Sequence, residues 1–205
     1  MTHVLTKRGM PRLLGVALVL GGFVGVATDL LQGYLNSPWL SLVNSASPWL
    51  TTAFAVGIVA RRRWHAAVAG LVACVAELLT YDMTASLRGF AVGGSMTAFW
   101  VVCGVIGGPL FGVGGRLWRE AGGPTRGLGP ALLGSALLAE GAITYALFLH
   151  YYSSALLFAV IGIAAIAVLG RHGRQYARTV LWMLGVLPSA MLAEVILHSV
   201  SSQAF

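Results

Sequence analysis

Charged residues are scarce in this chain of 205 residues, since Asp, Glu, Lys and Arg make up 9% of it and hydrophobic residues 58%. The mean hydropathy is +0.83. A soluble domain could not bury so much apolar surface, so the composition excludes one and predicts an integral membrane protein. The apolar runs are continuous rather than alternating, which is typical of helices and disfavours a β-barrel.

Recognisable catalytic motifs are also lacking. The chain contains no Asp-rich helical motif for Mg²⁺–diphosphate, no His-Glu-x-x-His, no Ser-His-Asp set and no nucleotide-binding glycine loop. These absences disfavour diphosphate substrates, and we expect neither a metal nor another cofactor. The two cysteines, Cys74 and Cys103, each lie within an apolar run. Free buried thiols are therefore expected rather than a disulfide.

Seven apolar runs approach the roughly 20 residues that a membrane span needs. They cover residues 13–31, 43–60, 65–81, 93–115, 128–149, 154–170 and 179–200. We therefore predict one all-α integral membrane domain over residues 1–205, built as a seven-helix bundle. The first run is too long for a signal-peptide core, so we read it as an uncleaved span. Gly104, Gly108 and Gly112 stand four residues apart, a spacing that permits close helix packing.

The basic residues predict the orientation of the spans. The net charge is +7, and with the N-terminus inside, twelve of the thirteen Lys and Arg residues fall in inner segments. Only Arg88 falls outside, as the positive-inside rule requires. The C-terminus is then outside, and the protein is expected in the cell membrane, as a multi-pass protein of the bacterial inner membrane. The positive charge orients the spans, so no nucleic-acid partner is expected.

Four acidic residues interrupt the apolar runs. Glu140 lies in Ala-Glu-Gly-Ala-Ile-Thr-Tyr, and Glu77 in the similar Val-Ala-Glu-Leu-Leu-Thr-Tyr, while looser copies surround Glu194 and Asp29. Each acid follows the last inner Arg by 14 to 17 residues. This separation places all four in one layer, roughly 21–26 Å above the inner surface. An ionisable residue within a span is costly and is a functional hypothesis by default.

No Lys or Arg is expected at the depth of this acid layer, so a salt bridge should not neutralise it. Burial without a cation disfavours a charged carboxylate, so at least one acid should be protonated at neutral pH. Polar neighbours follow at helical spacing, including Thr144 after Glu140 and His198 after Glu194. The alternative is structural: Glu77 and Glu194 would only join helices by hydrogen bonds, and Asp29 would reach the outer interface.

Aromatic side chains are frequent at the same level and could stabilise a cation through their ring faces. The predicted substrate-binding residues are Trp39, Trp49, Tyr81, Trp100, Tyr145 and His198. The first outer loop contains Ser-Pro-Trp-Leu twice, around Trp39 and Trp49. These rings are either interfacial anchors or parts of a lid that faces a cavity. A metal site from Glu194, His198 and His150 is disfavoured because it lacks a second His at helical spacing.

Two resemblances bear on function. The stretch Asn44-Ser45-Ala46-Ser47-Pro48-Trp49-Leu50 resembles a group of small actinobacterial integral membrane proteins. The overall plan of about 200 residues, seven spans and intramembrane acids is similar to that of membrane-bound terpene cyclases of meroterpenoid and indole-sesquiterpenoid pathways. That similarity implies protonation of an epoxide or alkene by a membrane-embedded acid, without a metal. A weaker likeness is to the substrate-binding subunits of energy-coupling-factor vitamin transporters.

The leading hypothesis is therefore an acid-initiated terpenoid cyclase or isomerase acting on a lipophilic substrate. Glu140 is the first candidate for general acid. Asp29, Glu77 and Glu194 would tune it, relay protons or accept the last proton. The rival is a small permease or solute-binding subunit for a cationic or aromatic solute or a proton, with the same acids binding it. A third reading is a purely structural membrane protein. The expected partners are the lipophilic substrate and membrane lipids.

Overall fold

The structure, a computed structural model, describes residues 9–204 and contains no strand within that range. The predicted all-α class is confirmed, with 85% of the described residues helical. Lys7 and Arg8, which the predicted topology places inside, lie outside the described residues. The helices are α2 (Gly9–Gln32), α3 (Leu40–Val43), α4 (Ala46–Val59), α5 (Arg63–Leu87), α6 (Gly94–Glu120), α7 (Leu128–Ala139), the π-helix η1 (Glu140–Phe148), α8 (Tyr152–Arg171), the 3₁₀ turn η2 (His172–Arg174) and α9 (Tyr176–Ala204).

Six helical segments in the described part of the chain are long and apolar enough to cross a membrane. They are α2, α5, α6, α7 with η1, α8 with η2, and α9. The remaining predicted span, residues 43–60, is the 14-residue helix α4. At 1.5 Å per residue, α4 is about 21 Å long and shorter than a hydrocarbon core of about 30 Å. Seven spans were predicted, and in the described residues six helices are long enough to cross a membrane while α4, at the place of the seventh, is shorter.

The chain folds as two compact units. The first unit contains the described residues up to Leu30 together with Trp49–Arg116, and the second contains Leu31–Pro48 and the residues from Leu117 onward. The division falls inside α4, between Pro48 and Trp49. Each unit has its own acidic residues, so each is described separately below.

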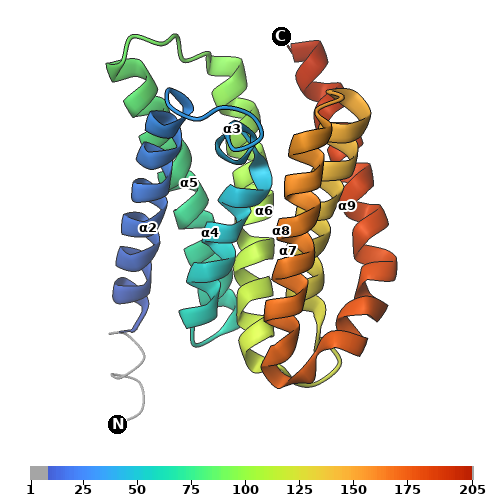
Figure 1. Cartoon of the computed structure of the whole chain (residues 1–205). Helices are drawn as coiled ribbons and strands as arrows, with labels where there is room; N and C mark the ends of the chain where they lie inside the picture. The colour runs from blue at the N-terminus through green and yellow to red at the C-terminus, as the bar shows by residue number, and fades with distance from the viewer. Residues whose placement is uncertain (1–8, 205) are drawn as a thin grey trace. The chain divides into compact units, whose positions relative to one another are not determined.

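Glycines allow the helices of the first unit to pack closely. The course of α2, α5 and α6 can be followed in Figure 1. A Cβ atom at Gly108 of α6 would lie 2.7 Å from the carbonyl oxygen of Gly70 in α5. A Cβ at Gly25 of α2 would collide with the carbonyl oxygen of Glu77 in α5. These contacts are possible only without a side chain, which confirms the predicted packing role of the glycine spacing in α6.

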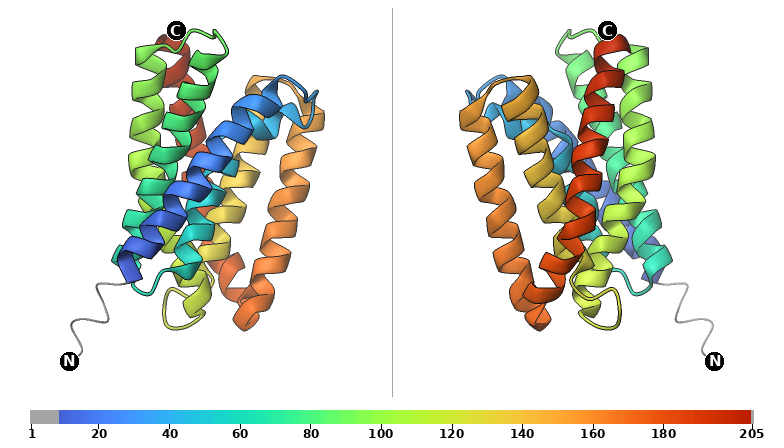
Figure 2. Two further views of the ribbon diagram at one scale, coloured as in Figure 1. Left: turned by 90° about the vertical axis from the view of Figure 1, so that its left-hand side faces the viewer. Right: turned by 90° about the vertical axis from the view of Figure 1, so that its right-hand side faces the viewer.

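The second unit contains α7, η1, α8 and α9 with the segment Leu31–Pro48. Figure 2 shows α7 with η1 running beside α8, and α7 also packs against α9. Gln175, which is fully buried, joins the turns before α7 and α9. Its side chain accepts a hydrogen bond from the Gly127 N–H at 2.9 Å and donates to the Trp118 carbonyl at 3.1 Å. The helix α9 continues unbroken through Pro188, and Figure 1 shows it curved along its length.

Candidate functional site

Glu77 is the most completely buried acid, with 0% of its surface exposed. It lies on α5, and the Thr52 hydroxyl of α4 donates to its Oε1 at 3.1 Å. Its other oxygen, Oε2, is buried and has no hydrogen-bond partner among the described residues. A buried polar atom without a partner is unusual in a folded protein and needs an explanation.

Aromatic rings pack about one helical turn away from the Glu77 carboxyl along α5. The Trp49 ring of α4 meets the Tyr81 ring of α5 edge to face at 5.5 Å and lies 6.4 Å from the Trp100 ring of α6. Trp49 Nε1 is also buried, and the described part of the chain offers it no hydrogen-bond partner. We call these residues, together with Thr52 and Glu77, the Glu77 cluster.

Helical spacing explains why the Glu77 cluster assembles. Trp49 and Thr52 are three residues apart on α4, and Glu77 and Tyr81 are four apart on α5, so each pair shares a helix face. Thr52 meets Glu77 and Trp49 meets Tyr81, which places the two contacts about 5.4 Å apart along the helices. An acid that can exchange a proton therefore lies close to rings that can stabilise a cation.

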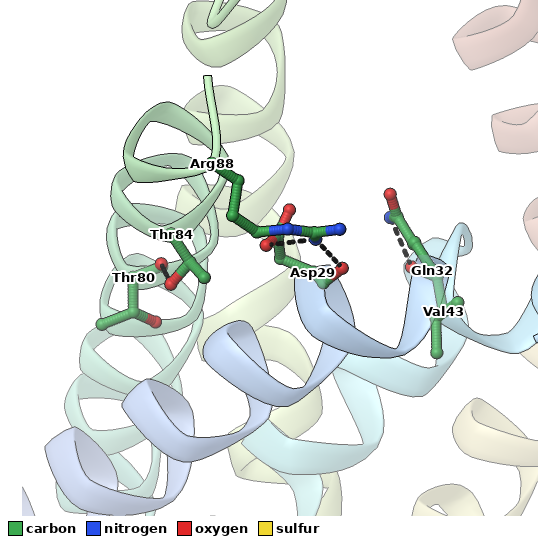
Figure 3. Close-up of polar contacts among 6 residues, drawn as sticks. All are labelled: Asp29, Gln32, Val43, Thr80, Thr84 and Arg88. Carbon is green, nitrogen blue, oxygen red and sulfur yellow. Dashed lines mark hydrogen bonds and ion pairs between the residues drawn. The ribbon is translucent and has the colours of Figure 1, made fainter. Parts of the chain in front are cut away.

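Asp29 corrects the expectation that no basic residue reaches the acid layer. Arg88 Nη1 donates to Asp29 Oδ2 at 2.8 Å and to the Asp29 carbonyl at 2.6 Å (Figure 3). The helix α5 continues to Leu87, beyond the predicted end at residue 81, and its C-cap residue Arg88 reaches across to α2. Asp29 is 3% exposed at its side chain and is neutralised as an ion pair. It is therefore not a free acid.

Glu140 caps a helix. Its Oε1 accepts the Ala46 N–H at 3.0 Å and its Oε2 accepts the Ser47 N–H at 2.9 Å, while the Ser47 hydroxyl also bonds to the carboxyl. Ala46 and Ser47 are the first residues of α4, where backbone N–H groups lack helical partners. Both carboxyl oxygens are therefore occupied as acceptors of backbone N–H groups at the start of α4. This geometry favours a capping role for Glu140 over the role of general acid.

Tyr145 holds the same segment in the second unit. Its hydroxyl lies 2.5 Å from Ser45 Oγ and donates to the Ser41 carbonyl at 3.1 Å. Ser41 Oγ in turn donates to Ser154 Oγ of α8 at 2.6 Å. Tyr145 is buried and its ring stacks on Phe158 at 5.0 Å. Because its hydroxyl is already bonded, Tyr145 positions the backbone that leads into α4.

Glu194 of α9 interacts electrostatically with Glu140, so the structure brings these two predicted acids near each other, and Glu194 and His198 contact different side chains. The Thr144 hydroxyl donates to Glu194 Oε2 at 2.8 Å, and the His198 ring stacks on Phe148 at 3.9 Å. Thr144 was predicted to share a face with Glu140, which lies four residues before it. Its hydroxyl bonds to Glu194 and not to Glu140, within η1, a π-helix in which residues five apart are hydrogen-bonded. The Leu149 N–H, for example, bonds to the Thr144 carbonyl at 3.0 Å.

The predicted site residues thus fall into different environments. One group lies together in the first unit: Trp49, Glu77, Tyr81 and Trp100. Trp39 has 55% of its surface exposed, which fits an interfacial anchor and not a lid ring facing a cavity. Sequence reasoning missed the polar partners Thr52, Ser41, Ser45 and Ser47. In the sequence, these residues are distinguished only by a hydroxyl side chain within or beside an apolar run. Within the described residues, no three His, Cys, Asp or Glu side chains gather as metal ligands do.

These features define the class: a multi-pass α-helical membrane protein with acidic residues buried between its helices. The chain belongs to DUF6518, a family of unknown function, whose family model matches residues 5–202. No curated protein and no solved structure matches the chain.

Proposed function

We propose that this protein is a membrane-embedded acid catalyst, a cyclase or isomerase that protonates a lipophilic isoprenoid-like substrate with Glu77. The observation that carries the proposal is the unpartnered Oε2 of a fully buried carboxyl, set beside the packed rings of the Glu77 cluster. Catalytic acids are commonly placed in apolar surroundings, where the neutral form is favoured. The similarity in plan to membrane-bound terpene cyclases points to the same chemistry.

Thr52 has a defined part in this mechanism. Its hydroxyl donates to Glu77 Oε1, so Oε1 acts as the carbonyl oxygen of the neutral acid. The transferable proton is then on Oε2, the atom without a partner in the described structure. Thr52 therefore orients the acid, and Glu77 delivers the proton.

The reaction balances without a co-reactant. The proton on Glu77 Oε2 moves to the substrate, to an epoxide oxygen or an alkene carbon. In the epoxide case one C–O bond breaks and its electron pair stays on oxygen. A neighbouring C=C bond attacks the cationic carbon and forms a C–C bond, while the rings of Trp49, Tyr81 and Trp100 stabilise the positive charge. Loss of a C–H proton to the Glu77 carboxylate restores the acid, so the product is an isomer of the substrate.

The topology proposed for this activity has the N-terminus inside and the C-terminus outside a bacterial inner membrane. In it α4 is the seventh crossing, a short helix that begins within the membrane. Capping of its first N–H groups by Glu140 supports this placement, because backbone groups at membrane depth need partners from the protein. The positive-inside distribution of Arg residues supports the same orientation.

The test is turnover by the purified protein in lipid nanodiscs, with isoprenoid epoxides and polyenes supplied in D₂O. We expect an isomeric product that carries deuterium, detected by mass spectrometry, and a loss of about 10²–10⁴-fold in Glu77→Gln. Asp82→Asn is the matched control, because Asp82 lies on the same helix but accepts a hydrogen bond from Thr97, outside the cluster. Wild-type turnover by Glu77→Gln is the result that rejects the acid role.

A permease or solute-binding subunit is the second candidate. The supporting observation is that each unit is built around an Ala-Glu helix followed by Thr-Tyr, at Glu77 and at Glu140. Related halves are common in secondary transporters. In that case Glu77 would bind a cationic or aromatic solute. Uptake into proteoliposomes that follows the membrane potential, without chemical change of the solute, distinguishes this function from catalysis.

A further inference from the structure

Glu77 Oε2 and Trp49 Nε1, two buried polar atoms of the first unit, have no hydrogen-bond partner in the described structure. Both belong to the Glu77 cluster, on facing positions of α5 and α4. The Thr52–Glu77 hydrogen bond and the Trp49–Tyr81 ring contact lie one helical turn apart, so the two residues are neighbours along the contact between α4 and α5. Nearly all buried polar groups in folded proteins are hydrogen-bonded, which makes two such atoms in one cluster evidence for a binding site.

The chemistry of the two atoms restricts the ligand. The indole Nε1–H of Trp49 is a donor only. With Thr52 bonded to Oε1, a neutral Glu77 offers its O–H at Oε2 as a second donor. Two donors are complemented by an oxygen with two lone pairs. An ammonium group cannot accept from Trp49, and a hydrocarbon leaves both donors unpaired.

We infer that the Glu77 cluster binds a lipophile through a hydrogen-bond-accepting oxygen, a carbonyl, ether or epoxide oxygen, with Trp49 Nε1–H as the residue that selects it. The inference rests on the proposed function, because it takes Glu77 to be the neutral acid. It narrows the ligand class, since a pure polyene and an organic cation are both disfavoured. Trp49 binds the oxygen, and Glu77 also delivers the proton.

The test uses farnesylacetone, an isoprenoid ketone, and the hydrocarbon in which a methylene replaces its carbonyl. Each is added to ¹⁵N-tryptophan-labelled full-length protein in nanodiscs, and the indole N–H signals are followed by NMR. The Trp49 signal is assigned by its absence from Trp49→Phe. We expect a downfield shift of this signal with the ketone only. Trp49→Phe should bind the ketone about 3- to 10-fold more weakly, as loss of one hydrogen bond predicts, and the hydrocarbon unchanged.

Trp39→Phe is the matched control, because Trp39 is exposed and lies outside the cluster. An unmoved Trp49 signal overturns the inference, whether the ketone fails to bind or a water molecule occupies both donors. Equal affinity for ketone and hydrocarbon overturns it as well. If Trp49→Phe does not fold, the wild-type signal can be assigned by its proximity to the Tyr81 ring, and the same two outcomes decide.

The inference and the proposed function fail separately. Loss of turnover in Glu77→Gln together with an unmoved Trp49 signal leaves the acid role in place and removes the oxygen-binding role of Trp49. A shifted Trp49 signal together with full turnover in Glu77→Gln leaves the binding site in place and removes the acid.

Discussion

Thr144 follows Glu140 by four residues, yet its hydroxyl donates to Glu194 Oε2 at 2.8 Å. The two copies of the acid motif explain this relationship. Glu77 and Tyr81 are four residues apart, whereas Glu140 and Tyr145 are five apart, so the second copy contains one extra residue. The π-helix η1 begins at Glu140 and accommodates the extra residue. Glu140 and Tyr145 therefore both reach the Ser41–Ser47 segment, and Thr144 turns toward α9.

Removal of the extra residue should restore an α-helix. We predict that deletion of Ala142, which recreates the four-residue spacing of the first copy, destabilises the protein by only about 1–3 kcal/mol. Deletion of Ala136 from the α-helical α7 is the control, because it rotates every later residue of that helix by about 100°. The control should yield no folded protein. The yield of folded protein in detergent compares the two deletions, thermal unfolding gives the loss of stability for the Ala142 deletion, and equal damage from both deletions would contradict this account of η1.

The Asp29–Arg88 pair should stabilise the protein without affecting turnover. Arg88 is 31% exposed at its side chain and Asp29 is buried, so we expect Asp29→Asn to lower the free energy of unfolding by about 1 kcal/mol. A double-mutant cycle with Arg88→Met measures the coupling between the two side chains. Turnover by Asp29→Asn should stay at the wild-type rate. A large loss of turnover in Asp29→Asn would contradict this prediction and indicate that Asp29 takes part in catalysis.

The helix α2 packs closely against α5 at the backbone of Glu77. A methyl group at Gly25 would collide with the Glu77 carbonyl oxygen and the Thr80 hydroxyl. Gly25→Ala should therefore destabilise the protein by about 1–3 kcal/mol. Gly15→Ala is the control on the same helix, because nothing lies within 4 Å of a Cβ there, and it should be neutral or slightly stabilising. Equal unfolding temperatures for the two variants would contradict this packing.

Hydropathy and charge predicted most of the fold because they report where a chain can cross a bilayer. The predicted run 128–149 matches α7 with η1 to within one residue, and 154–170 lies inside α8. The length of α4 could not be predicted in this way. Its start depends on Glu140, which lies 94 residues after Ala46 in the sequence.

The sequence predicted which types of residue form the candidate site, but not which of these residues lie together. Helical spacing placed Glu77 and Tyr81 on one face, but their contacts with Thr52 and Trp49 depend on how α4 packs against α5. The different surroundings of Glu77 and Glu140 could not be predicted, since the two motifs are nearly identical. Only the donors around each carboxyl distinguish them, and those donors come from distant segments.

The most direct test compares Glu77→Gln with Glu140→Gln in the same nanodisc preparation, by turnover per folded molecule and by thermal unfolding. Glu77→Gln should lose turnover and keep its stability, because an amide oxygen can still accept from Thr52. Glu140→Gln should lose about 1–3 kcal/mol of stability, because the amide keeps one acceptor oxygen and its nitrogen cannot accept from the second of the Ala46 and Ser47 N–H groups. The folded fraction of Glu140→Gln should keep turnover. The reverse pattern, with activity lost at Glu140 and stability lost at Glu77, would contradict the assignment of the acid to Glu77.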